Sequence, residues 1–252
     1  MKRKKLRYRI AESLGYELVK MKKRQKMPNS LESNIARVLD MQRVNCVVDV
    51  GANTGQYGSL LRKIGYSGRI ISFEPVRACF DILAHEAASD PNWSCRPCAL
   101  GREDGTRSLN VMSASVFSSF LDANAYAARR FDESVDVERV EEVEVRRLDS
   151  LFGDLTREIE EPRVFLKMDT QGFDLEVFAG ASTCLDQIVG LQSELSLIPI
   201  YKGMPGFVDA IETYRRHDFE VTHIHPVSRD SSRLVLLEVD CVMSRRPTAD
   251  RT

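Results

Sequence analysis

The chain has 252 residues, of which 43% are hydrophobic and 29% charged, and its formal net charge is −1. This length suffices for one α/β domain with a full core, and the composition is that of an ordinary globular protein. No apolar run is long enough to cross a bilayer, which excludes a membrane-spanning helix. The six cysteines show no spacing typical of extracellular disulfide frameworks, so we expect free thiols in a cytoplasmic protein.

The amino-terminal segment, residues 1–26, carries eleven lysines and arginines against Glu12 and Glu17, which leaves the remainder acidic. This segment is not a secretory signal, because it has no apolar core and no cleavage site. Apolar residues recur every four positions at Leu6, Ile10, Leu14 and Leu18. This spacing predicts an amphipathic helix, either on an anionic membrane surface or packed on the domain. We therefore predict a basic helical extension over 1–42, a main domain over 43–243 and a tail over 244–252.

The run Cys46–Val50 predicts a strand buried on both faces, and a glycine loop follows it. Gly51 and Gly55 allow a sharp turn and a close approach of backbone to a ligand. The free N–H groups where the next helix starts can face an anion. With Asn53 and Thr54 between the glycines, this loop is the first half of a predicted nucleotide-type pocket.

A second strand ends at Glu74, 19 residues beyond Gly55, where an acid accepts the hydroxyls of a ribose. Asn53 stands where a dinucleotide site needs its second glycine, so NAD and FAD fit poorly. No phosphate-binding G-x-x-x-x-G-K-[ST] loop occurs in the chain. A ligand with a ribose and a carboxylate but no phosphates remains, and we predict S-adenosylmethionine.

The middle of the chain continues the alternation of helix and strand signals. We predict a helix over 76–88, a third strand over Trp93–Ala99, and a hairpin turn at Asp104-Gly105. Cys95 and Cys98 form a lone C-x-x-C without a second pair, which argues against zinc. Two short β runs that can pair, 106–111 and 140–147, enclose an aromatic-dotted insert, 113–137, which is either a linker or a substrate lid.

The second half predicts the remaining strands and helices of one doubly wound sheet that ends in a hairpin. We predict strands over 163–169, 188–195, 219–225 and 234–243, and helices over 172–180 and 207–216.

Two acids, Asp169 and Glu194, close neighbouring strands at the edge where such sheets bind ligands. Asp169 can act as general base, hold the amine of the ligand, or cap the next helix. Lys167 precedes it on the same side of the strand, so an ion pair with either acid or a substrate contact is expected. A divalent cation held by these acids, with Asp174, is an alternative.

His223 and His225 alternate on one face of a predicted strand, which makes His223 a further candidate base. Packing or surface roles are the alternative for both. The loop from Tyr201 onward follows the fifth strand, and with the insert it is a candidate for acceptor contacts.

Four segments occur in an order typical of one family: Val48–Gly55, Phe73–Pro75, Leu166–Gly172 and Gln192–Leu195. Together they resemble the FkbM family of S-adenosylmethionine-dependent methyltransferases over about residues 43–242. The Lys-x-Asp-x-Gln-Gly pattern that begins at Lys167 is the most specific of them. Asp174 departs from the family, which commonly has glutamate there, and the shorter acid has less reach.

The resemblance implies a class I methyltransferase (Rossmann-like) α/β fold, with a seven-stranded doubly wound sheet whose last strand is antiparallel. It also implies O-methylation, typically of sugar hydroxyls on natural products, glycolipids or polysaccharides. We expect the cofactor to contact residues of the first three strand ends and of the fourth: Asp49, Gly51, Asn53, Thr54, Gly55, Glu74, Ala99, Leu100 and Asp169.

Two other functions stay open at this point, an RNA methyltransferase and a non-catalytic module that binds S-adenosylmethionine. The acidic body argues against nucleic acid as a partner. A small-molecule or lipid-linked sugar acceptor is expected instead, with peripheral contact to the inner membrane surface through residues 1–26 as one arrangement. The sequence leaves a homodimer open.

Overall fold

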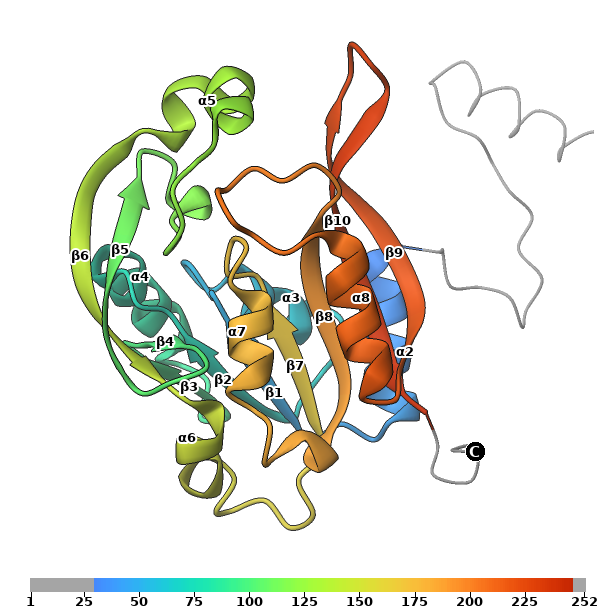
Figure 1. Cartoon of the computed structure of the whole chain (residues 1–252). Coiled ribbons are helices and arrows are strands. Elements are labelled where there is room, and N and C mark those ends of the chain that lie inside the picture. Colours follow the sequence, from blue (N-terminus) through green and yellow to red (C-terminus); the bar gives the residue numbers. More distant parts are fainter. Residues whose placement is uncertain (1–29, 247–252) are drawn as a thin grey trace, which may run out of the picture. The chain divides into compact units, whose positions relative to one another are not determined.

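The computed structural model describes residues 30–246, and the predicted basic helix over 1–26 lies outside them. The chain forms a seven-stranded sheet with helices on both faces and a small three-stranded sheet beside it (Figure 1). The main sheet has the order β3-β2-β1-β7-β8-β10-β9. Its strands are β1 (Cys46–Val50), β2 (Arg69–Phe73), β3 (Trp93–Arg96), β7 (Val164–Met168), β8 (Ile188–Ser196), β9 (Phe219–Asp230) and β10 (Val235–Arg245).

The last strand runs against its neighbours, as predicted. β10 pairs antiparallel with both β8 and β9, whereas β1, β2, β3, β7 and β8 pair in parallel. The order reverses at β1, which lies between β2 and β7, and a doubly wound sheet binds its ligand at such a point. The fold is therefore the class I, Rossmann-like arrangement with the last strand antiparallel.

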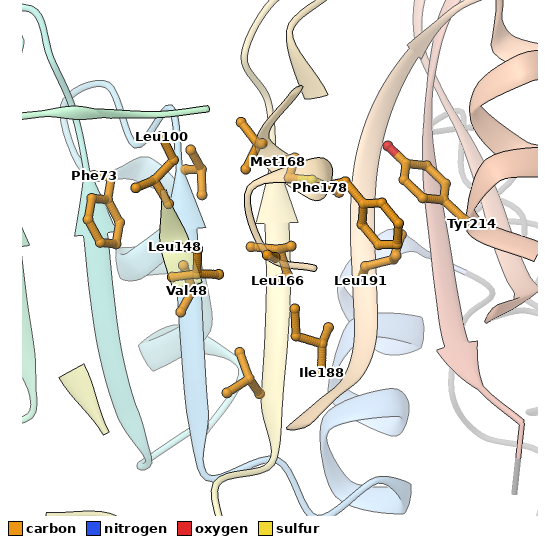
Figure 2. Packing of buried hydrophobic residues seen from close by; sticks show 14 of the residues in the cluster. Val48, Phe73, Leu100, Leu148, Leu166, Met168, Phe178, Ile188, Leu191 and Tyr214 are labelled. Atoms are coloured by element: carbon orange, nitrogen blue, oxygen red, sulfur yellow. The ribbon is translucent and has the colours of Figure 1, made fainter. Parts of the chain in front are cut away.

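Two apolar clusters, one on each face, hold the helices to the sheet. The helices are α2 (Leu31–Met41), α3 (Gln56–Lys63), α4 (Arg77–Ala87), α6 (Leu148–Leu155), α7 (Asp174–Ala179) and α8 (Phe207–Arg216). On one face α2, α3 and α4 bury Val47 and Phe165, and on the other α6, α7 and α8 bury Val48 and Leu166 (Figure 2). Successive residues of β1 and β7 thus serve opposite faces, as residues of a fully buried strand do.

The predicted third strand is wrong in its extent. It breaks at Pro97, which has no N–H for a ladder, and the chain leaves the main sheet there. The next strand, β4 (Ala99–Leu100), joins the small sheet in the order β4-β6-β5. The turn at Asp104-Gly105 is therefore not a hairpin between paired neighbours, because β6 lies between β4 and β5.

The two short runs do pair, as predicted, as β5 (Gly105–Met112) and β6 (Val137–Arg146) in antiparallel register. The insert between them is folded, with α5 (Ala125–Phe131) flanked by the short 3-10 turns Ser115–Phe117 and Asp132–Val135. The closing hairpin of β9 and β10 extends several residues beyond the prediction (Figure 1). Among residues 30–246 no helix has the length and apolar character needed to cross a membrane.

Two glycines with opposite surroundings test how tightly the small sheet packs on α7. A Cβ at Gly180 would lie 2.0 Å from the backbone oxygen of Gly101, whereas a Cβ at Gly153, exposed in α6, meets nothing within 4 Å. We expect Gly180→Ala to lower the free energy of unfolding by about 1–3 kcal/mol, through backbone displacement. Gly153→Ala, the matched control, should raise it by up to about 1 kcal/mol, because alanine favours helix. Urea unfolding measures both, and equal effects would contradict the packing described.

Candidate functional site

A cavity of about 570 Å³ opens at the carboxyl ends of the central strands. Its walls come from the loops after β1, β2 and β7, from α3, from β4, β8, β9 and β10, and from the insert. The polar residues that line it are Asn53, Gln56, Glu74, Ser115, Ser118, Ser119, Lys167, Asp169, Thr170, Gln171, Gln192, Glu194, Ser228, Glu238 and Asp240. This volume suits a ligand of cofactor size.

The loop after β1 approaches β7 so closely that only glycine fits. Gly51 has a φ of +72°, and a Cβ there would lie 2.0 Å from the carbonyl oxygen of Asp169. Gly55 has a φ of +95° and starts α3. Both glycines are thus required by backbone conformation, and they place the start of α3 beside the cavity.

Glu74 is buried at the end of β2 and faces the cavity, with 5% of its surface exposed. Its carboxylate accepts hydrogen bonds at 2.8 Å from the backbone N–H groups of Asn53 and Val76. Burial raises the pKa of Glu74 to about 7, against the lowering effect of these two N–H groups and of Lys167. The carboxyl therefore gains or loses its proton near neutral pH.

Asn53 joins this acid to the insert. Its backbone is left-handed, with a φ of +48°, and its side-chain amide donates to the hydroxyl of Ser115 at 3.2 Å. The same side chain accepts from the backbone N–H of Thr54 at 2.9 Å. Asparagine tolerates this conformation better than most residues because its side chain bonds locally.

A buried ion pair crosses the centre of the sheet. Lys167 of β7 lies opposite Asp49 of β1 in the register, and their side chains meet at 3.2 Å. The ammonium also lies 3.6 Å from Asp169 and donates to the carbonyl of Gly51 at 3.2 Å. Burial lowers the pKa of Lys167, but the two carboxylates outweigh it, so the pKa stands above its usual value. The prediction of an ion pair with Asp169 is confirmed, and Asp49 is the closer partner.

The ion pair continues as a polar row on the α3 side of the sheet. Ser72 donates to Asp49 at 3.1 Å, and the Trp93 indole donates to Ser72 at 3.0 Å. On the other side the Tyr57 ring packs against the Lys167 ammonium, and its hydroxyl donates to Gln192 at 3.0 Å. Gln192 in turn donates to Asp240 at 2.9 Å. The row spans six strands and satisfies polar groups that would otherwise be costly to bury.

Four carboxyls gather where β7, β8 and β10 meet the cavity: Asp169, Glu194, Glu238 and Asp240. Burial raises the pKa of Glu194 well above its usual value, and the negative charges of the other three add to the shift. Burial likewise raises the pKa values of Glu238 and Asp240. Because these like charges lie in one partly dry site, each ionised carboxyl opposes ionisation of its neighbours.

The side chain of Asp174 holds the turn after β7 by hydrogen bonds. Its carboxylate accepts from the backbone N–H and hydroxyl of Thr170 and from the hydroxyl of Ser193, and Tyr214 donates to Ser193. It does not line the cavity. The shorter acid is thus matched to a turn that it caps directly.

The structure brings most of the predicted site residues together. The cavity is lined by Gly51, Asn53, Glu74, Ala99, Leu100, Asp169 and Glu194. Asp49, Thr54 and Gly55 are not part of the lining. His223 is not part of the lining; its ring stacks with that of His225, and burial and His225 lower its pKa. The geometry gives His223 no contact with the cavity.

Tyr201 is almost fully buried and lines no part of the cavity, so the predicted acceptor contact at this residue is not supported. Sequence reasoning missed Tyr57, Glu238 and Asp240. The two acids did leave a signal, because they alternate within an otherwise apolar strand. In the described part of the chain, no cluster of three or more His, Cys, Asp or Glu side chains is arranged to hold a metal ion.

The buried ion pair gives a stability prediction with an internal control. Lys167→Met leaves the carboxylate of Asp49 buried without its cation, and we expect it to cost about 3–5 kcal/mol of unfolding free energy. Lys202→Met removes an ion pair with Asp122 whose side chains are both 67% exposed, and should cost at most about 1 kcal/mol. Urea unfolding at pH 7 measures both. A Lys167 variant as stable as the Lys202 variant would show that the pair contributes nothing.

Comparison with solved structures gives distant likenesses. One is an rRNA methylase from Streptococcus thermophilus, with 10% identity over 86% of this chain and 94% of that one and a TM-score of 0.43. A second is a putative RNA methyltransferase from Pyrococcus horikoshii, with 16% identity, coverage of 98% and 100%, and a TM-score of 0.42. A third is a precorrin-6y C5,15-methyltransferase from Geobacter metallireducens, with 11% identity, coverage of 90% and 95%, and a TM-score of 0.44. A search of curated proteins finds no match.

The family comparison is direct, because the model of the methyltransferase FkbM domain matches residues 49–221. The match runs from the buried aspartate of β1 to the start of β9, and so includes the glycine loop, Glu74 and the Lys-x-Asp-x-Gln-Gly segment. The chain belongs to the family of FkbM-domain methyltransferases, enzymes that use S-adenosylmethionine.

Proposed function

We propose that the protein transfers a methyl group from S-adenosylmethionine to a hydroxyl of a neutral sugar, free or lipid-linked. The observation that carries the proposal is the charge of the cavity. Among the described residues that line it, the acidic and basic side chains are five carboxyls and one lysine. Carboxylates attract a sulfonium and an ammonium and accept hydrogen bonds from sugar hydroxyls, whereas they repel an anionic acceptor.

The residues present fit the cofactor. Gly51 and Asn53 line the cavity together with Gln56 and Tyr57 of the first turn of α3, so this helix start faces the space in which the ligand carboxylate would lie. Glu74 faces the cavity, where it can accept two ribose hydroxyls. Ala99 and Leu100 supply an apolar wall suited to adenine. When bound there, the cofactor supplies an electrophilic methyl group.

The chain itself must orient the acceptor oxygen and take its proton. Asp169 is the exposed member of the carboxyl group, with 38% of its side chain accessible, and it lies between the cofactor loop and Glu194. We assign it to receive the acceptor proton on its carboxylate, while Lys167 holds its other oxygen at 3.6 Å. General bases of this kind contribute about 10²–10⁴-fold in rate. Positioning of the acceptor against the methyl group contributes the rest.

An RNA acceptor is the alternative, and the same charge argues against it. A phosphodiester backbone that approached the cavity would meet five carboxyls and a single lysine. The basic segment 1–26 lies outside the described residues and carries no argument for either acceptor.

The pKa of Glu74 predicts a pH dependence of cofactor binding. Ribose hydroxyls donate to the ionised carboxylate. Below its pKa of about 7 the carboxyl carries a proton, and this proton must be lost for tight binding. The association constant for S-adenosylmethionine should therefore rise between about pH 6 and 8 and then level off. Glu74→Gln should bind about tenfold more weakly at pH 8 and lose this rise, because no charged acceptor remains.

Calorimetric titration at several pH values measures this, and Glu160→Gln, at an exposed loop position, is the control that should behave as wild type. Equal affinities of wild type and Glu74→Gln at pH 8 would remove Glu74 from the ribose site.

The acceptor class is tested with methyl-labelled S-adenosylmethionine and a panel of neutral glycans, glycolipids, anionic glycans and RNA oligonucleotides. We expect label in a neutral glycan or glycolipid. Asp169→Asn should lower kcat for that acceptor by about 10²–10⁴-fold because the base is lost. Asp186→Asn, at an exposed position away from the cavity, should match wild type. Label in RNA alone would overturn the sugar assignment.

A further inference from the structure

Gln171 lies in the tight turn after β7 and bridges two of the cavity carboxyls. Its backbone is left-handed, with a φ of +52°. Its side-chain amide nitrogen donates to Asp169 at 3.2 Å and to Glu194 at 2.7 Å. One amide thus holds acids from two neighbouring strands, with one hydrogen for each acceptor.

The oxygens of Gln171 connect the same turn to the insert. The side-chain oxygen accepts from the hydroxyl of Tyr201 at 2.7 Å, and this hydroxyl also lies 2.9 Å from the carbonyl of Phe117. The backbone oxygen accepts from the hydroxyl of Ser119 at 2.7 Å. Phe117 and Ser119 belong to the insert and line the cavity. A single residue therefore contacts both carboxyls and the wall opposite them.

The insert is packed as one body with the loop that carries Tyr201. The backbone N–H of Asn124 donates to Ile200 at 2.9 Å, and that of Lys202 donates to Asp122 at 2.9 Å. Tyr201 itself is 2% exposed and lies in an apolar cluster with residues of the insert. Because this body is packed, the direction of the Gln171 amide is set by the protein and not by solvent.

Asp169 is consequently held from two sides. Gln171 donates to one carboxylate oxygen, and the Lys167 ammonium lies near the other. Such double support fixes the plane of a carboxyl group, which a general base needs in order to meet an acceptor proton. The remaining charged groups near the pair are Glu238 and Asp240 of β10.

We propose that Gln171 is a positioning residue, which sets Asp169 and Glu194 relative to each other and, through Tyr201, ties them to the insert. The position of the insert at the cavity and the orientation of the two carboxyls then depend on the same residue. The inference rests on the proposed function, in which these carboxyls face the acceptor.

The tie to the insert is measured without any substrate, by hydrogen exchange of the full chain. Gln171→Met keeps the length of the side chain and removes its hydrogen bonds, and Tyr201→Phe removes the hydroxyl. We expect each to speed exchange of the insert amides at residues 115–119 about tenfold. The double variant should be no faster than the single ones, because both remove one connection.

Gln187→Met, at a partly buried glutamine outside the cavity, is the control and should leave the insert unchanged. Unchanged exchange in Gln171→Met, or additive effects in the double variant, would overturn the tie. This result does not depend on whether any acceptor is methylated.

The effect on the carboxyls is measured by kinetics once an acceptor is in hand. Gln171→Met should lower kcat at least tenfold with the Kd for S-adenosylmethionine within twofold of wild type. It should also move the acidic limb of the kcat profile to higher pH, because the amide donors favour the ionised pair. Gln171→Glu keeps the oxygen toward Tyr201 but loses the donors, so it should keep the insert protected and still lose kcat.

A kcat loss without a shift of the pH profile would reduce Gln171 to a structural part of the turn. Absence of methyl transfer by wild type to every acceptor would instead contradict the proposed function, with the exchange result standing by itself.

Discussion

The buried pair of Lys167 and Asp49 is the interaction on which the site depends. It joins the two strands at the centre of the sheet, and its ammonium reaches the carbonyl of Gly51 and the carboxylate of Asp169. Burying two charges is unfavourable unless the geometry and the remaining hydrogen bonds compensate. Here the polar row through Ser72 and the Tyr57 ring provides this compensation, and one cation contacts both the Gly51 loop and Asp169, the residue that we propose as base.

The second constraint is the closeness of the loop to β7. At Gly51 any side chain would collide with the backbone of Asp169, so the cofactor loop and the residue assigned as base are in direct contact. A change in one shifts the other. The opposite wall is coupled in the same way, because Asn53 reaches Ser115, and Gln171 reaches Ser119, both in the insert. The cavity is thus bounded by elements that cannot move independently of each other.

The charge of this cavity follows from the same arrangement. The positive charge of Lys167 offsets the negative charge of Asp49 and part of that of Asp169. The other carboxyls of the cavity, Glu194, Glu238 and Asp240, have raised pKa values. A cationic cofactor improves the electrostatics of such a site, and a neutral polyol does not worsen them.

Much of the fold could be predicted from the sequence, because the main strands are continuous apolar runs bounded by glycine, proline and acids. The glycine loop and Glu74 could be predicted for the same reason, since a left-handed turn and an acid at a strand end leave local signals. Pro97 was a local signal that the prediction overlooked. The place of β4 in the small sheet, the burial of Tyr201 and the Asp49 partner of Lys167 could not be predicted, because they depend on contacts between segments far apart in the sequence. His223 shows the limit of face arguments: the periodicity placed it correctly beside His225, but only the pairing of β9 with β10 shows which side of the sheet it faces.

The most direct test of this account is a crystal structure of the chain with S-adenosylhomocysteine. We predict both ribose hydroxyls within hydrogen-bonding distance of the Glu74 carboxylate, the amino-acid end over Gly51, and the sulfur facing Asp169 and Glu194. A ligand whose sulfur points away from both carboxyls, or whose ribose does not reach Glu74, would contradict the assignment of this cavity.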